Sequence, residues 1–178
     1  MDTLPDYLEK GLDIVLVGLN PSDYSVQEGH YFANPRNRFW AAFNASGLVG
    51  RPLSATDDHR MMEYGIGFTD VVKRPTSQAS HLKASDHRQW APILKEKLEH
   101  VQPLIACFQG LMAYGIYLRH AEGVKERPRL GLQTHTLGSS EIFVVPNPSP
   151  ANAQYSLEDL AMWYQKLKNL KGGVKAGG

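Results

Sequence analysis

Four short apolar runs stand out along the chain. The runs are Asp13–Leu19, Ile66–Val72, Leu104–Phe108 and Glu141–Pro146. Because their apolar character is continuous rather than alternating, each run is typical of a central strand that helices cover on both faces. A further segment, Gln133–Leu137, is expected to pair with the fourth run as a hairpin around Gly138-Ser139-Ser140.

Segments with helical periodicity separate these runs. The expected helices are Asn37–Ser46, Ala55–Tyr64, Ser85–His100, Gly110–Arg119 and a last helix that begins at Ser156. Strands that alternate with helices predict an α/β fold, a three-layer sandwich with a central, mostly parallel sheet of four to five strands flanked by helices. We expect a single domain over residues 1–171 and a flexible tail over residues 172–178.

Two long stretches, Pro21–Arg36 and Pro146–Tyr155, show neither pattern. Compact domains rarely keep such long loops without a function. Each stretch follows a predicted strand, and open α/β sheets bind their ligands at the carboxyl ends of the strands. The two stretches are therefore expected to meet at a binding site.

Composition narrows the classes of function. A single cysteine, Cys107, excludes an internal disulfide and a cysteine-ligated iron–sulfur cluster. The histidines lack the paired spacing of a zinc site, so we expect no metal and no cofactor. No apolar run is long enough for a membrane helix, and the acidic N-terminus is unlike a signal peptide. The net charge of +1 does not by itself indicate a nucleic-acid partner.

The two long stretches carry the most distinctive residues. Gly18-Leu-Asn-Pro-Ser22 turns the chain sharply at the end of the first strand. Pro146-Asn-Pro-Ser-Pro-Ala-Asn152 places proline at three alternate positions, which stiffens a polar loop. Taken singly, the first motif is an ordinary turn and the second a rigid surface loop.

Together, these motifs resemble the mismatch-specific uracil/thymine DNA glycosylases, one branch of the uracil-DNA glycosylase superfamily. That branch carries Gly-(Ile/Leu)-Asn-Pro after its first strand, then an aromatic residue, Asn-(Arg/His)-Phe-Trp, and a Pro-Ser loop near its end. The matching residues here are Gly18-Leu-Asn-Pro21, Phe32, Asn37-Arg-Phe-Trp40 and Asn147-Pro-Ser149. The segments Tyr64–Thr69, Arg74-Pro-Thr76 and Gly131-Leu-Gln133 also follow in the expected order, and the resemblance covers roughly residues 11–171.

The resemblance implies a monofunctional glycosylase that flips uracil out of DNA, especially from G·U mismatches, and so starts base excision repair. It implies that Asn20 positions the attacking water and that Phe32 stacks on the flipped base. Main-chain groups around Leu19 and Phe32 are expected to bind the pyrimidine edge, and Asn37 is expected to brace their loop. Ser25 is expected to leave room beside C5 of the pyrimidine.

Thr69 and Asp70 end the second predicted strand beside the expected pocket. We assign Thr69 to substrate binding and Asp70 as a candidate catalytic residue that holds or activates water. An equally weighted alternative is that Asp70 forms a structural ion pair with Arg74.

DNA contacts are expected from Arg36, from Arg74 and from the Pro-Ser loop. The loop residues are Asn147, Pro148, Ser149, Pro150, Ala151 and Asn152. Arg38, Lys73 and Lys83 also flank the pocket segments and suit a weak grip on phosphates.

The loop lacks the large wedge residue with which the family fills the hole left by the flipped base. Asn152, Gln154 or Tyr155 is expected to take that place. This departure favours broader action on uracil, including uracil in single strands.

Two other functions stay open at the level of sequence: a non-catalytic module that binds uracil or abasic DNA, and a hydrolase of free nucleosides. Asn20 argues against the first, and the stiff loop with its flanking basic residues argues against the second. No lysine in the motifs is placed to attack the sugar, so no lyase step is expected. We expect a bacterial monomer that acts on nucleoid-associated DNA in the cytoplasm, with no membrane partner.

Overall fold

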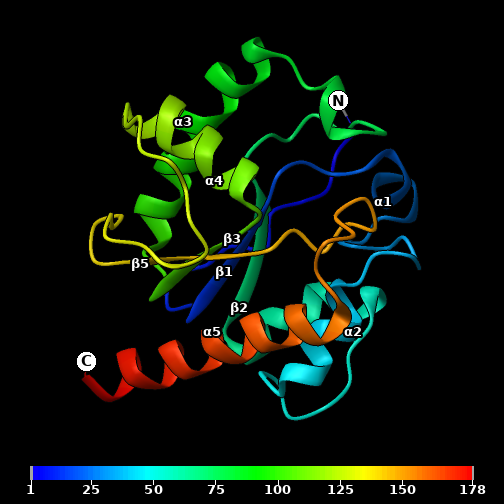
Figure 1. The fold of residues 1–178 in the computed structure, drawn as a ribbon, viewed down its shortest axis with the longest axis vertical. Coiled ribbons are helices and arrows are strands. Elements are labelled where there is room, and N and C mark those ends of the chain that lie inside the picture. Colours follow the sequence, from blue (N-terminus) through cyan, green and yellow to red (C-terminus); the bar gives the residue numbers. More distant parts are fainter. Residues whose placement is uncertain (1, 178) are drawn as a thin grey trace.

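A computed structural model describes residues 2–177 of the chain. Its centre is a five-stranded sheet with the strand order β2-β1-β3-β5-β4 (Figure 1). The strands are β1 (Ile14–Gly18), β2 (Ile66–Asp70), β3 (Ile105–Gln109), β4 (Gly131–Leu132) and β5 (Glu141–Val145). The pairs β1–β2, β1–β3 and β3–β5 are parallel, and β4 pairs antiparallel with β5. Each of the four parallel strands falls on one of the predicted apolar runs.

Helices cover both faces of the sheet, which makes the predicted three-layer sandwich (Figure 1). The helices of the two outer layers are α2 (Phe39–Ser46), α3 (Ala84–Val101), α4 (Leu111–Tyr117) and α5 (Leu157–Gly177). Ile14 and Leu16 of β1 pack in the apolar cluster under α2 and α5, whereas Val15 and Val17 pack in the cluster under α3 and α4. Both faces of the strand are therefore buried, as the continuous apolar pattern predicts.

Four further helical segments lie among the described residues, and the longest of them has 10 residues. They are α1 (Asp23–Glu28), the 3₁₀ helices η1 (Ala55–Tyr64) and η2 (Ala79–His81), and a π-helical turn η3 (Leu118–Glu122) that continues α4. Helix α1 lies inside the stretch 21–36, which we expected to be irregular. The Ser22 hydroxyl accepts a hydrogen bond from the Ser25 N–H at 3.0 Å at its start, and Gly29 ends it with a φ of 77°. A helix this short shows no sequence periodicity, which is why the pattern missed it.

The partner of β5 and the end of helix α5 differ from the sequence prediction. The regular antiparallel partner of β5 is β4 rather than the segment 133–137, although the Gln133 N–H still donates to the Ile142 carbonyl at 2.9 Å. Leu137 and Ser140 exchange two backbone hydrogen bonds around the expected turn. Helix α5 continues to Gly177, so residues 172–177 of the expected tail are helical, while residue 178 lies outside the described residues.

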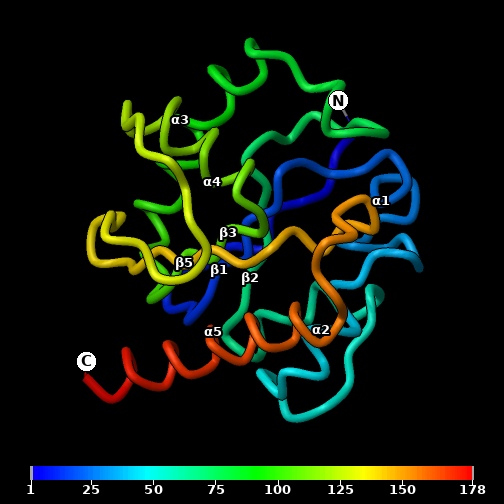
Figure 2. The backbone as a smooth tube through the Cα atoms, viewed as in Figure 1, coloured from blue at the N-terminus to red at the C-terminus, as the bar shows by residue number. Residues whose placement is uncertain are grey.

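None of the helices within residues 2–177 combines the length and the apolar character that a membrane crossing requires. The backbone trace in Figure 2 shows where the site is to be found: the stretch after β1 and the stretch after β5 run on the same side of the sheet.

The N-terminal segment closes the outer edge of β2. Tyr7 and Phe68 exchange two backbone hydrogen bonds, of 2.9 Å and 3.1 Å. This approach needs a glycine beside it, because a Cβ on Gly67 would stand 2.2 Å from the Tyr7 carbonyl oxygen and 2.8 Å from Cδ1 of Leu12.

The substitution Gly67→Ala is expected to lower the free energy of unfolding by about 1–3 kcal/mol, since backbone and side chain must both move to admit the methyl group. Gly172→Ala serves as the control, because a Cβ there meets no atom within 4 Å. The control is expected to raise stability by up to about 1 kcal/mol through helix propensity. Urea unfolding measures both, and wild-type stability in Gly67→Ala would contradict the described packing of the N-terminal segment.

Candidate active site

A cavity of about 920 Å³ lies at the carboxyl ends of the strands. Both long stretches contribute to its wall, as the sequence predicts. Most of the predicted site residues line it: Leu19, Asn20, Ser25, Phe32, Arg36, Asn37, Asp70, Asn147, Ser149, Pro150, Ala151 and Asn152. Thr69, Arg74 and Pro148 do not line the cavity.

The carboxamide of Asn20 is held in one orientation. Its Nδ2 donates to the carbonyl oxygen of Arg74 at 3.0 Å, to Oγ1 of Thr76 at 2.8 Å and to the carbonyl oxygen of Pro21 at 3.2 Å. The Thr76 hydroxyl itself donates to Gln78, so toward Asn20 it can only accept. Three acceptors around one atom identify that atom as the amide nitrogen. The oxygen Oδ1 is left to accept a hydrogen bond from a ligand or water.

Phe32 has the backbone and the neighbours of a positioned side chain. Its φ is 53°, a left-handed conformation that is uncommon outside glycine and that concentrates at functional sites. The ring stacks on Phe39 with centroids 4.4 Å apart and an interplanar angle of 25°. Phe32 is half-buried and also lines the cavity, so it belongs both to the core and to the site.

Three other predicted site residues near Phe32 in the sequence form hydrogen bonds with the main chain. Ser25, on α1, is buried, and its hydroxyl accepts the Ala33 N–H at 3.4 Å. Oδ1 of Asn37 accepts the Phe39 N–H at 2.9 Å and so fixes the start of α2. The Leu19 carbonyl, one residue beyond β1, accepts the Val72 N–H at 2.9 Å, so this main-chain oxygen already has a partner.

Asp70 ends β2 with its carboxylate buried. Its Oδ2 lies 3.6 Å from Nζ of Lys73, so its ion-pair partner is Lys73 and not Arg74, the partner proposed from sequence. Burial raises the pKa of Asp70 to about 6, although Lys73 opposes that rise. Oδ1 leans over Gly18, because a Cβ built there would stand 2.5 Å from it.

Lys73 belongs to a buried polar cluster rather than to a DNA-binding surface. Its Nζ lies 2.9 Å from Oδ1 of Asp6 and donates to the Tyr31 hydroxyl at 3.1 Å. Lys97 reaches the other oxygen of Asp6 at 2.6 Å. Burial opposes ionisation of Asp6, but these contacts outweigh it and lower the pKa of that carboxyl. Lys73 is therefore not available to phosphates, contrary to expectation.

Two further assignments from sequence are corrected. The Thr69 hydroxyl donates to Asp6 at 2.7 Å, away from the cavity, because successive side chains of a strand point to opposite faces. The Arg74 guanidinium makes a two-pronged contact with Asp86, at 2.8 Å and 2.7 Å, and this contact lowers the pKa of Asp86 to about 2. Arg74 thus stabilises the chain before α3.

Arg38 ties the two long stretches together. Its guanidinium donates to the carbonyl oxygens of Ser149, at 3.1 Å, and Asn152, at 2.9 Å, and also to that of Tyr155. Its own N–H donates to the Pro148 carbonyl at 3.2 Å. Arg38 was expected to grip phosphates, but the structure uses it as a clamp on the Pro-Ser loop.

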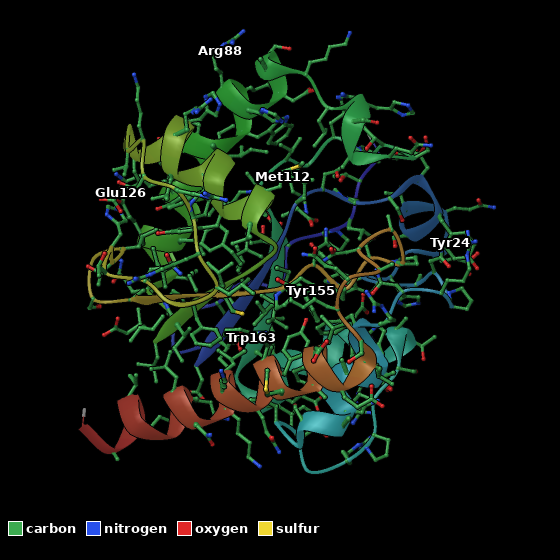
Figure 3. The ribbon with its side chains drawn as sticks, in the orientation of Figure 1. Tyr24, Arg88, Met112, Glu126, Tyr155 and Trp163 are labelled. Carbon is green, nitrogen blue, oxygen red and sulfur yellow. The ribbon has the colours of Figure 1, made fainter. Side chains whose placement is uncertain are left out.

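The Pro-Ser loop is further shaped by its own side chains. Oδ1 of Asn147 accepts the Ser149 N–H at 2.9 Å, and Nδ2 of Asn152 donates to the Asn147 carbonyl at 3.0 Å. Tyr155 packs against the core beneath the loop (Figure 3). Of the three residues considered as a wedge, only Gln154 is exposed and makes no hydrogen bond within residues 2–177.

The rim of the cavity carries one charge and two apolar side chains. Arg36 is exposed there. Leu111 and Met112, at the start of α4, are 39% and 60% exposed and line the cavity. Met112 is labelled in Figure 3.

Gln109 is a cavity residue that was not predicted from the sequence. It ends β3 and lines the cavity floor with only 2% of its surface exposed. The signal was present, because Gln109 is a polar residue at the carboxyl end of an apolar strand, as Asp70 is. No group of three or more His, Cys, Asp or Glu side chains is arranged to hold a metal ion in the part of the chain that the structure describes.

Comparison with known proteins shows the fold and the family of the chain. A solution NMR structure from Methanosarcina acetivorans, of a protein provisionally named a uracil DNA glycosylase, is similar with a TM-score of 0.63 and 22% sequence identity. The similarity covers 97% of each chain, and at this identity it shows a shared fold. The model of the family "Uracil DNA glycosylase superfamily" matches residues 5–170. Since that match spans nearly the whole chain, the protein belongs to the uracil DNA glycosylase superfamily.

Proposed function

We propose that the protein is a monofunctional DNA glycosylase that removes uracil from DNA by hydrolysis of its N-glycosidic bond. The observation that carries the proposal is the fixed carboxamide of Asn20 in the same cavity as Phe32 and the Pro-Ser loop. A base inside a duplex is out of reach, so the nucleotide must rotate into such a cavity. Superfamily membership supports the reaction class.

The chemistry follows from the site. The bond between N1 of uracil and C1′ of the sugar breaks, its electron pair leaves with the base, and C1′ acquires oxocarbenium character. A water held by Oδ1 of Asn20 then bonds to C1′ and loses its proton to solvent or to the departing uracil anion. An amide is too weak a base to take that proton, so Asn20 is proposed to orient the water rather than to activate it. Hydrogen-bond donors directed at the uracil oxygens stabilise the leaving anion.

Asp70 is proposed to act as a carboxylate. In both candidate roles, holding the water and accepting the N3–H of the base, the ionised carboxylate is the stronger acceptor. Nζ of Lys73, 3.6 Å from Oδ2, lowers the pKa of Asp70 against the effect of burial.

The proposed substrates are uracil opposite guanine and uracil in single strands. The sequence motifs favour the mismatch-specific branch, and the Pro-Ser loop presents only polar or small side chains, with Gln154 exposed. A single-stranded substrate leaves no hole to fill, so a large wedge is not required for it.

The substitution Asn20→Ala is expected to lower the single-turnover rate of uracil release from a G·U duplex by at least about tenfold, with duplex affinity kept within about twofold. Asn169→Ala, on the exposed side of α5, is the matched control and is expected to behave as wild type. Alkali cleavage of labelled DNA measures release, and free deoxyuridine is run beside it. Unchanged release in Asn20→Ala would show that the water is held elsewhere, and cleavage of deoxyuridine alone would favour a nucleoside hydrolase.

The rate of uracil release is expected to fall as the pH drops through about 6, because the Asp70 carboxyl takes up a proton there. Asp70→Asn is expected to be slower than wild type above that pH and to lose this decline. A pH–rate profile of the chemical step under single-turnover conditions tests both. The same decline in Asp70→Asn as in wild type would assign it to another group.

Arg36 and Arg38 are expected to differ in their effect on the salt dependence of DNA binding. Arg36→Gln removes an exposed rim charge and is expected to lower the slope of log Kd against log salt by about 0.9, the value for one phosphate contact. Arg38→Gln is expected to weaken binding with an unchanged slope, since its guanidinium holds the loop. Fluorescence anisotropy at several salt concentrations measures the slopes. A lower slope for Arg38→Gln would mean that the clamp opens and Arg38 contacts phosphate.

A further inference from the structure

The floor of the cavity holds a polar side chain that the fold does not use. Gln109 is 2% exposed, and neither its Nε2 nor its Oε1 has a hydrogen-bond partner among the described residues. Leaving a buried carboxamide unpaired destabilises a protein, so such a group is usually explained by a role outside the fold itself. Gln109 also lines the cavity, which directs attention to a ligand.

The register of the sheet places Gln109 in a row with Asp70. Gly18 of β1 pairs with Asp70 of β2, and Val17 pairs with Phe108, so Gly18 and Gln109 are neighbours on adjacent strands. Side chains in this row point to the face of the sheet that α2 and α5 cover, because Leu16, Phe68 and Cys107, two residues earlier in each strand, belong to that cluster. The row therefore reads Asp70, Gly18, Gln109.

The glycine in the middle of the row makes room for the Asp70 carboxylate. A Cβ built on Gly18 would stand 2.5 Å from Oδ1 of Asp70, and among the described residues no atom outside Asp70 lies within 4 Å of it. Neighbouring strands are about 4.8 Å apart, so the backbones of β2 and β3 lie about 10 Å apart on either side of Gly18. Within this span a ring edge at the cavity floor would meet the Asp70 carboxylate from the β2 side and the Gln109 carboxamide from the β3 side.

The orientation of a flipped pyrimidine follows from its chemistry. N1 carries the sugar, which stays at the mouth with the DNA backbone. C4 lies opposite N1 across the ring, so the C4 and N3 edge enters deepest and meets the floor. Uracil presents an acceptor at O4 and a donor at N3 there. An ionised Asp70 can only accept, so of the two buried side chains at the strand ends only Gln109 can donate to O4.

We propose that Gln109 is a substrate-binding and specificity residue whose carboxamide donates to the C4 oxygen of the flipped base at the cavity floor. The inference rests on the proposed glycosylase function and deepens it, since it names the base edge that the floor selects. A role in binding the base also explains why a buried polar residue without a hydrogen-bond partner among the described residues stands at the carboxyl end of β3.

The test compares two bases in otherwise identical duplexes. One duplex carries deoxyuridine, and the other carries 4-thiodeoxyuridine, in which a weakly accepting sulfur replaces the C4 oxygen while N3–H is kept. Gln109→Leu is expected to lower single-turnover release of uracil by at least about tenfold while changing release of 4-thiouracil by less than about threefold, because the C4 sulfur has little hydrogen bonding to lose. Gln109→Met repeats the test with an unbranched side chain of similar length.

Thermal unfolding separates this role from a structural one. Removal of an unpaired buried amide is expected to leave the melting temperature of Gln109→Leu equal to or above that of wild type. Gln89→Leu, the same change on the exposed face of α3, is the matched control and is expected to release both bases as wild type does.

The release rates of the two bases and the melting temperature together distinguish the possible roles of Gln109. Unchanged uracil release in the Gln109 variants, or an equal fall for both bases, overturns the inference while the glycosylase function stands. A lowered melting temperature with an equal fall for both bases assigns Gln109 to the fold. Failure of the wild-type protein to release either base would refute the proposed function and this inference with it.

Discussion

The orientation of one carboxamide is the constraint on which the site depends. Nδ2 of Asn20 is surrounded by three acceptors, two of them contributed by the chain that follows β2. Because the Thr76 hydroxyl is committed as a donor to Gln78, the amide cannot turn over without losing these bonds. The segments that follow β1 and β2 thus fix the orientation of the Asn20 side chain, with Oδ1 left as its hydrogen-bond acceptor. A group that orients water for a dissociative reaction needs a fixed direction more than it needs basicity.

Pre-organisation extends to the opposite wall of the cavity. The Arg38 guanidinium donates hydrogen bonds to three carbonyl oxygens in and just after the Pro-Ser loop. The sequence suggested a DNA contact for this charge, whereas in the structure it holds the loop in place. With the prolines, this clamp leaves the loop little conformational freedom to lose on binding. Phe32 is held in a similar way, by its stack on Phe39. The cavity is therefore built from elements that are already in place before a nucleotide enters.

Elements with a repeating pattern of apolar residues could be predicted from the sequence. Side-chain roles that depend on a residue far away along the chain could not. The continuous apolar strands identified the parallel sheet, and the strand-end rule placed Asn20 and Asp70 at one edge. The same rule was misapplied to Thr69, since adjacent residues of a strand face opposite sides. The partners of Arg38, Lys73 and Arg74 were not foreseeable, because an ion pair depends on chain positions that only the fold brings together. Helix α1 was missed because it is too short to show a period.

We propose that a flipped uracil enters this cavity with its sugar beside Asn20. The structure of the protein bound to a G·U duplex that carries 2′-fluoro-deoxyuridine, whose glycosidic bond resists hydrolysis, tests this arrangement. We expect the base outside the helix, stacked on Phe32, with its C4 edge at the floor and a water bridging Oδ1 of Asn20 and C1′. A uracil that stays paired in the helix, or that binds with C1′ remote from Asn20, would refute it.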